Sequence, residues 1–276
     1  MNAPLPADTT VGPPAPAEDP NSVERLRARV AAGRLGWTWP VALALVRLPL
    51  ILIGYALAYA AYRATGAADP WGAAQASNLF WFTLVVDLPC LALLVWRTRA
   101  EGLRLRDLIG YRADRLPLDV GLGLGVGVAM LVILFVVQFA LSLALGLSPS
   151  GASGFTPPPP WIGWWGVLVF PIAVGFVEEM VYRGYSQPRF EALTGSAGRG
   201  VLLMTLAFGA QHLVLPLVSP QVSLVRFGAT AATALFLGWV YVRTRRLTAL
   251  ILGHWLADLL GLGLPLLAAA LAAAGR

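Results

Sequence analysis

Several ionisable side chains lie within long apolar stretches of this chain. Its two histidines, His212 and His254, each fall inside such a stretch. Glu178 and Glu179 end another stretch, and Arg183 follows four residues after the second acid. A charged side chain at the centre of a bilayer costs about 2.5 to 3.5 kcal/mol on insertion scales, so it usually marks a functional site. These residues therefore predict a buried reaction centre.

The acid pair divides into two environments on a helix. Residues four apart share one face, so Arg183 can neutralise and orient Glu179. Glu178 points about 100° away from that face. We expect it to lack a full countercharge, and burial would then make its carboxylate a better acceptor for a proton from water.

The two histidines also have partners at helical spacing. Phe208 lies four residues before His212, and Asp258 lies four residues after His254, where it can accept or orient a hydrogen bond. A water held between Glu178 and His212, facing donors near His254, would place a base, a nucleophile and an oxyanion stabiliser together. This combination predicts a hydrolase.

The same residues resemble the motifs of the CAAX protease and bacteriocin-processing family, which includes type II CAAX prenyl endopeptidases. The family motifs E-E-x-x-x-R, F-x-x-x-H and H-x-x-x-N/D correspond here to Glu178-Glu179…Arg183, Phe208…His212 and His254…Asp258. They occur in the same order and on separate apolar stretches. The resemblance covers about 161–267 and implies an intramembrane endopeptidase within a core of several helices.

The resemblance also implies roles. Glu178 and His212 would activate the attacking water, while His254 would help to stabilise the oxyanion. Asp258 stands where the best-known members carry Asn, and an ionised Asp cannot donate to an oxyanion. Asp258 therefore either holds a proton or orients His254. The supporting residues are Glu179, Arg183 and Phe208.

A metal is the alternative to direct activation by glutamate. Glu178, His212 and His254 offer the nitrogen and oxygen ligands that zinc takes. The zinc-peptidase motif H-E-x-x-H is absent, however. We favour the metal-free mechanism and expect no cofactor.

The composition shows what must position these residues. Hydrophobic residues make up 58% of the chain and charged residues 12%, with a mean hydropathy of +0.71; soluble domains carry about 25% charged residues. We predict an all-α, polytopic membrane helical bundle. A crossing needs about 20 helical residues, and seven stretches qualify or nearly so: 40–62, 79–96, 118–145, 161–182, 200–217, 222–242 and 247–267. Glycines and a proline near 261–265 could separate an eighth, short helix at 266–274.

The fourth stretch must be longer than its apolar residues suggest. If the helix ended at Tyr182, Glu178 would lie about 6 Å from its end, whereas His212 would lie about 18 Å into the fifth helix. The two could not meet. We therefore expect the helix to continue to about Leu193, with a kink at Pro188.

Arginine placement predicts the topology. The chain has 20 basic residues, all arginine, and most lie between apolar stretches on one predicted side: Arg25, Arg27, Arg29, Arg34, Arg97, Arg99, Arg104, Arg106, Arg112, Arg115, Arg183, Arg189, Arg199, Arg243, Arg245 and Arg246. Arg63 and Arg276 fall on the opposite side, and Arg47 and Arg226 lie in apolar stretches near one end. By the positive-inside rule this predicts a cytoplasmic N-terminus and, with seven spans, a C-terminus on the opposite side. We expect the protein in the plasma membrane. The arginines are topology signals, so we expect no nucleic-acid partner.

We expect three parts along the chain. A basic cytoplasmic segment, 1–36, contains a disordered tail at 1–20 and a short surface helix within 21–34. N-terminal spans follow at 37–147, and the protease-like core occupies 161–267.

Three functions fit these features. The first is an endopeptidase for a peptide or protein, prenylated or membrane-bound, that reaches the site from the bilayer or the cytoplasm. The second is a non-catalytic peptide-binding, bacteriocin-immunity or regulatory protein. The third, a proton-coupled transporter, predicts inverted repeats with matched broken helices. The sequence has none, and the buried ionisable groups cluster in its C-terminal half.

Overall fold

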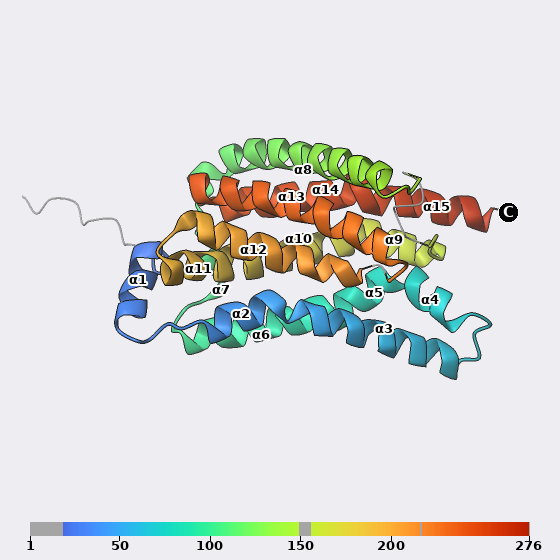
Figure 1. Cartoon of the computed structure of the whole chain (residues 1–276), viewed down its shortest axis with the longest axis horizontal. Helices are drawn as coiled ribbons and strands as arrows, with labels where there is room; N and C mark the ends of the chain where they lie inside the picture. The colour runs from blue at the N-terminus through green and yellow to red at the C-terminus, as the bar shows by residue number, and fades with distance from the viewer. Residues whose placement is uncertain (1–18, 149–155, 216, 276) are drawn as a thin grey trace, which may run out of the picture.

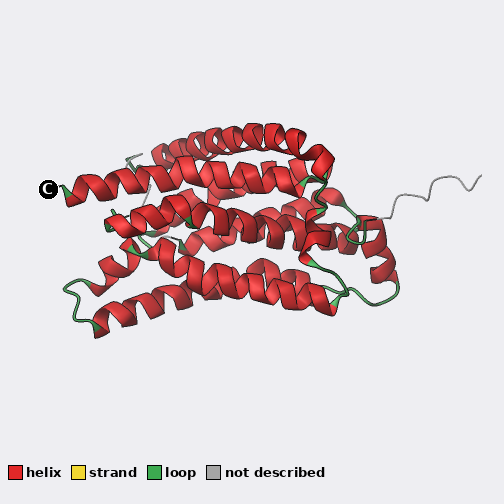
Figure 2. Ribbon diagram, turned by 180° about the vertical axis from the view of Figure 1, so that it is seen from behind, coloured by secondary structure: helices red, strands yellow, loops and turns green. Residues whose placement is uncertain are grey.

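The computed structural model of the protein describes residues 19–148, 156–215 and 217–275. Helices run through all of these ranges, and no strand occurs in them (Figure 2). The predicted all-α membrane bundle is confirmed. The tail predicted at 1–20 lies almost entirely outside the described residues.

The N-terminal half contributes a short leading helix and three long helical elements: α1 (Val23–Ala31), α2 (Thr38–Leu45), α3 (Arg47–Ala64), α4 (Pro70–Ala76), α5 (Asn78–Phe82), the π-helical η1 (Thr83–Asp87), α6 (Leu88–Ala100), α7 (Leu105–Ile109), the 3-10 turn η2 (Ala113–Arg115) and α8 (Leu116–Ala144). The helix predicted within 21–34 is α1, which packs on α11 with Leu26 fully buried.

The C-terminal half carries the predicted site: α9 (Pro160–Leu168), α10 (Phe170–Glu179), the π-helical η4 (Met180–Ser186), α11 (Gln187–Thr194), α12 (Ala197–Gln211), the 3-10 turn η5 (His212–Val214), α13 (Pro220–Thr244), α14 (Leu247–Asp258), the π-helical η6 (Leu259–Gly263) and α15 (Leu264–Ala274).

The described residues contain five helices long and apolar enough to cross a membrane, or six if the bent pair formed by α9 and 170–194 is one span. The predicted count of seven is not confirmed. Helix α12 has 15 residues before the chain tightens into η5 at His212. This length is about 22 Å, which is short of a full crossing.

The predicted break near 261–265 is wrong, because η6 joins α14 to α15 in one helix of 28 residues.

The fourth predicted helix does continue past its apolar part. From Phe170 the chain stays helical to Thr194, close to the expected end. Its bend of 44° lies between Leu168 and Phe170, not at Pro188. Pro188 has no N–H to donate one turn back, and the Gly184 carbonyl accepts from Asn21 Nδ2 at 2.9 Å instead.

Three arginines are buried where the sequence predicted a loop or the end of an apolar stretch. Arg183 and Arg189 were expected in a cytoplasmic segment, but both are buried within the long helix. Arg47, expected near the end of a stretch, is fully buried too. Which end of the bundle faces the cytoplasm stays a prediction.

The site-bearing helices lie in the middle of the bundle. Helices α10 and α12 run between a group made of α8, α13 and α14 and a group made of α2, α3 and α6 (Figure 1). Helix α10 packs on α14, and α12 packs on α13. The most extensive pairing is α8 with α14, where a Cβ on Gly127 would lie 2.9 Å from the Gly253 carbonyl. Small residues therefore allow backbone contact there.

A buried carboxylate ties three elements together at the end of the bundle near α1. Glu101 follows α6 and binds Arg29 of α1 at 2.9 Å and Arg189 of α11 at 2.7 Å. Arg97 and the Tyr185 hydroxyl donate to its other oxygen. Burial alone would raise the pKa of Glu101, but the guanidinium of Arg189, with these other donors, lowers it to about 2.

Candidate active site

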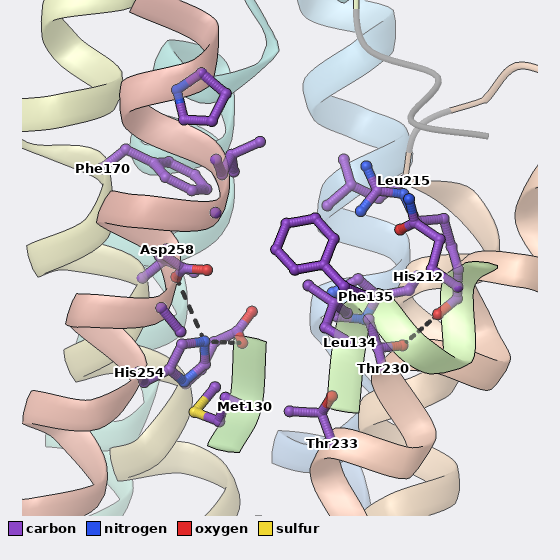
Figure 3. Close-up of a pocket in the computed structure, with 18 of the residues that line it drawn as sticks. Met130, Leu134, Phe135, Phe170, His212, Leu215, Thr230, Thr233, His254 and Asp258 are labelled. Atoms are coloured by element: carbon purple, nitrogen blue, oxygen red, sulfur yellow. Dashed lines mark hydrogen bonds and ion pairs between the residues drawn. The ribbon is translucent and has the colours of Figure 1, made fainter. Parts of the chain in front are cut away.

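A cavity of about 340 Å³ opens among α8, α10, α12, α13, α14 and α15, and its wall is mostly apolar. Glu178, His212, His254 and Asp258 all line it, as does Phe208. Figure 3 shows His254 and Asp258 on one side of this cavity and His212 on the other. The four residues predicted to be catalytic therefore line the same cavity.

Glu179 and Arg183 lie behind the cavity wall and orient His254. Arg183 Nη1 donates to Glu179 Oε1 at 2.9 Å, so the predicted pair is present. His254 Nδ1 lies 2.8 Å from the same oxygen. Because a carboxylate accepts, Nδ1 carries the proton, and this contact fixes the ring so that Nε2 faces the acids in the cavity.

Three polar atoms converge at this corner. His254 Nε2 lies 3.4 Å from Asp258 Oδ2 and 3.7 Å from Glu178 Oε2 (Figure 3). Both distances exceed the usual range of a hydrogen bond. The helical spacing of His254 and Asp258 thus brings them face to face, and one small molecule can contact all three groups at once.

Glu178 has a countercharge, so the expectation that it lacks one is wrong. Arg47 Nη2 donates to Glu178 Oε1 at 2.9 Å, and Gln211 Nε2 donates to the same oxygen at 3.0 Å. The expectation considered only partners on the helix of Glu178. The countercharge comes instead from α3, more than 130 residues earlier in the chain.

Sequence reasoning missed Arg47 as a member of the site, and Asp87 of η1 lies beside it. Arg47 Nη2 also donates to Asp87 Oδ1 at 2.9 Å, and Arg47 Nε donates to Gln211 Oε1 at 2.8 Å. Both charged side chains are fully buried. The sequence did offer a signal for this pair: Arg47 and Asp87 carry opposite charges inside the first two apolar stretches. Charges inside a membrane rarely occur without a partner, so the two could have been predicted to meet.

His212 ends α12 with one ring nitrogen committed. Its Nδ1 lies 3.0 Å from the Phe208 carbonyl, which can only accept, so Nδ1 carries the proton and Nε2 is free. The Phe208 and His212 ring centroids are 5.1 Å apart, which confirms the predicted aromatic contact. The ion pairs of Glu178 within the described ranges involve Arg47 and His254, not His212.

The residues proposed as zinc ligands are not arranged as a metal site. In the part of the chain that the structure describes, no three His, Cys, Asp or Glu side chains are placed to hold one metal ion. Both imidazoles use Nδ1 for protein hydrogen bonds, which leaves Nε2 as the ring nitrogen that could bind a metal. Within the described residues, however, Glu178, His212 and His254 are not grouped around one position for a zinc ion.

Fold and site together define a multi-pass helical membrane protein with a buried carboxylate–histidine cavity. Residues 159–260 match the family model described as "Rce1-like: Type II CAAX prenyl endopeptidase Rce1-like", which confirms the resemblance read from the motifs. This part of the chain is similar to Rce1-like type II CAAX prenyl endopeptidases, and the similarity suggests a CAAX-protease-type intramembrane peptidase. Comparisons with curated proteins and with solved structures gave no match. Arg47 and Asp87 lie outside the matched residues.

Proposed function

We propose that the chain is an intramembrane endopeptidase that hydrolyses a peptide bond with a water activated by Glu178 and a histidine. The observation that carries this proposal is the convergence of Glu178 Oε2, His254 Nε2 and Asp258 Oδ2 inside the cavity. A base, a ring nitrogen and room for a water and a carbonyl are the parts that hydrolysis needs.

The proposed reaction starts when Glu178 takes a proton from the water. The water oxygen attacks the peptide carbonyl carbon at the same time. The carbonyl oxygen becomes an oxyanion, which a proton on Nε2 of His254 stabilises while Glu179 holds Nδ1. The carbon–nitrogen bond then breaks, and the proton from Glu178 passes to the leaving amine. The elements of water end up divided between the two fragments.

The other two cavity residues have supporting parts in this scheme. His212, with Nε2 free, accepts from the attacking water on the side opposite Glu178. For Asp258 we choose the orienting role, because Oδ2 faces His254 Nε2 at 3.4 Å. In that position an oxygen that accepts from Nε2 until the oxyanion forms is sufficient, so the amide of other family members is not required.

The cavity also suggests the substrate. Apart from the polar cluster it is lined mainly by apolar side chains of membrane-spanning helices, including Met130, Leu134 and Phe170. We propose a peptide or protein whose cleaved segment is apolar or lipid-modified, presented at the plasma membrane. Binding of such a chain releases water from apolar walls, which favours association.

The test uses the purified full chain in lipid vesicles with matched peptides that carry, or lack, a farnesyl thioether. Mass spectrometry should find two complementary fragments whose masses add up to peptide plus water. Tight binding without any cleavage across the panel would contradict the proposal and favour the non-catalytic alternative. Metal analysis belongs to the same preparation: one equivalent of zinc that activity requires would overturn the metal-free scheme.

A further inference from the structure

We propose that Arg47 is a positioning residue of the active site, which fixes Glu178 Oε1 so that Oε2 is left for the attacking water. This inference rests on the proposed peptidase function. It also places an essential part of the site outside the matched segment 159–260.

The two oxygens of Glu178 have different surroundings. Oε1 accepts from Arg47 Nη2 at 2.9 Å and from Gln211 Nε2 at 3.0 Å, whereas Oε2 faces His254 at 3.7 Å. A glutamate side chain otherwise samples many rotamers. Two donors from two other helices hold this one in a single orientation, as hydrolysis requires of a base.

The guanidinium itself is fixed from three sides. Asp87 Oδ1 holds Nη2, Gln211 Oε1 holds Nε, and the group lies over the Phe82 ring at 5.0 Å from its centroid. Phe82 lines the cavity, so Arg47 sits directly behind the cavity wall. Because the guanidinium is planar, its Nε and Nη2 donors keep a fixed angle that a lysine ammonium cannot reproduce.

Holding the fold together does not account for this arrangement. Buried ion pairs are weak contributors to stability, since desolvation offsets their attraction, and apolar replacements are often tolerated. A guanidinium shared by two carboxylates buries three charged groups, so the desolvation cost is larger still. One of those carboxylates, Glu178, belongs to the family motif.

The experiment compares steady-state cleavage by four forms of the full chain in vesicles. Arg47→Gln/Asp87→Asn removes both charges, so no unpaired Asp87 is left to disturb folding. Arg47→Lys keeps the positive charge and loses the fixed pair of Nε and Nη2 donors. The matched control, Arg246→Gln/Asp119→Asn, removes another interhelical ion pair, of 2.6 Å, away from the cavity.

A displaced base costs turnover more than binding, so we expect kcat to fall about 100-fold in the Arg47→Gln/Asp87→Asn form with KM changed less than about threefold. Arg47→Lys should show the same split with a smaller fall. The thermal midpoints of both should remain near that of the control, whose kcat should equal that of the wild type.

Wild-type kcat in the Arg47→Gln/Asp87→Asn form, or in Arg47→Lys if the double variant does not fold, would overturn the positioning role. Neither result would touch the peptidase proposal, which Glu178→Gln tests separately. If the wild type itself cleaves no peptide, the proposed function fails, and this inference fails with it.

Discussion

At the level of single residues, the site works by giving chemically similar carboxylates different neighbours. Glu179 Oε1 receives Arg183 and His254 and is turned away from the cavity, whereas Glu178 is clamped through one oxygen and open through the other. Two adjacent glutamates thus point in different directions and have different roles, because successive helical positions are about 100° apart. One orients a histidine, and the other meets the water.

Asp258 gives a residue-level prediction. If it orients His254 as an acceptor, Asp258→Asn keeps an acceptor oxygen and should retain kcat/KM within about tenfold, the worth of one neutral hydrogen bond. Asp258→Leu, of similar volume without an acceptor, should lose clearly more. Peptide cleavage rates at saturating and limiting substrate check this. Complete inactivity of Asp258→Asn would show that its carboxylate is required for proton transfer.

At the level of elements, the contact between α8 and α14 holds one wall of the cavity. We predict that Gly127→Ala destabilises the protein by about 1 to 3 kcal/mol, because its Cβ would lie 2.9 Å from the Gly253 carbonyl. Gly125→Ala is the matched control: nothing lies within 4 Å of a Cβ there, and alanine favours the helix. Thermal unfolding in detergent should separate the two; equal midpoints would contradict the close packing.

The Glu101 tie predicts a pH dependence of stability. Its folded-state pKa of about 2 lies below the ordinary value of 4.5, so its stabilisation is complete above about pH 4.5 and disappears as pH falls toward 2. We expect Glu101→Gln to lower the free energy of unfolding by about 2 to 3 kcal/mol at pH 7, and the difference to shrink below pH 4.5.

The check is to measure unfolding of wild type and Glu101→Gln side by side between pH 7 and pH 3. Glu24→Gln, an exposed acid of α1, serves as the control and should follow the wild type at every pH. A stability difference for Glu101→Gln that does not change with pH would mean that packing, not charge, makes the contribution.

Local spacing predicted the partners that lie on one helix, and it failed for partners on different helices. The pairs Glu179–Arg183, Phe208–His212 and His254–Asp258 follow from a four-residue repeat. The clamp on Glu178 needs α3, η1 and α12 to meet, which no spacing within one segment encodes. Depth arithmetic did predict the continuation of the long helix to Thr194, but not the bend before Phe170.

For the whole molecule, composition was enough to predict a helical membrane bundle. So few residues are charged that the apolar surface must face a lipid bilayer, where backbone groups have to bond within helices. The number of spans was not predictable from apolar length alone. Helix α12 ends at His212, which lines the cavity, before it is long enough for a full crossing. An apolar stretch that ends at the site therefore resembles a membrane span in the sequence.

The arginine distribution predicts the orientation of the whole molecule. In a Cys90→Ser background, a single cysteine at Thr65→Cys should react with a membrane-impermeant maleimide added to intact cells. Ala113→Cys should react only after the membrane is permeabilised, since its segment carries the arginines predicted to be cytoplasmic. Both positions are exposed. The reverse labelling pattern would place the N-terminus outside.

The central claim is that Glu178 activates water for peptide hydrolysis, and the most direct measurement is the single-turnover cleavage rate of Glu178→Gln beside wild type in the same vesicles. The amide keeps the shape and cannot take the proton, so we predict a fall of about 100-fold or more. Asp114, an exposed acid that pairs with Arg112 and does not line the cavity, gives the control: Asp114→Asn should cleave at the wild-type rate. Wild-type cleavage by a folded Glu178→Gln would contradict the mechanism.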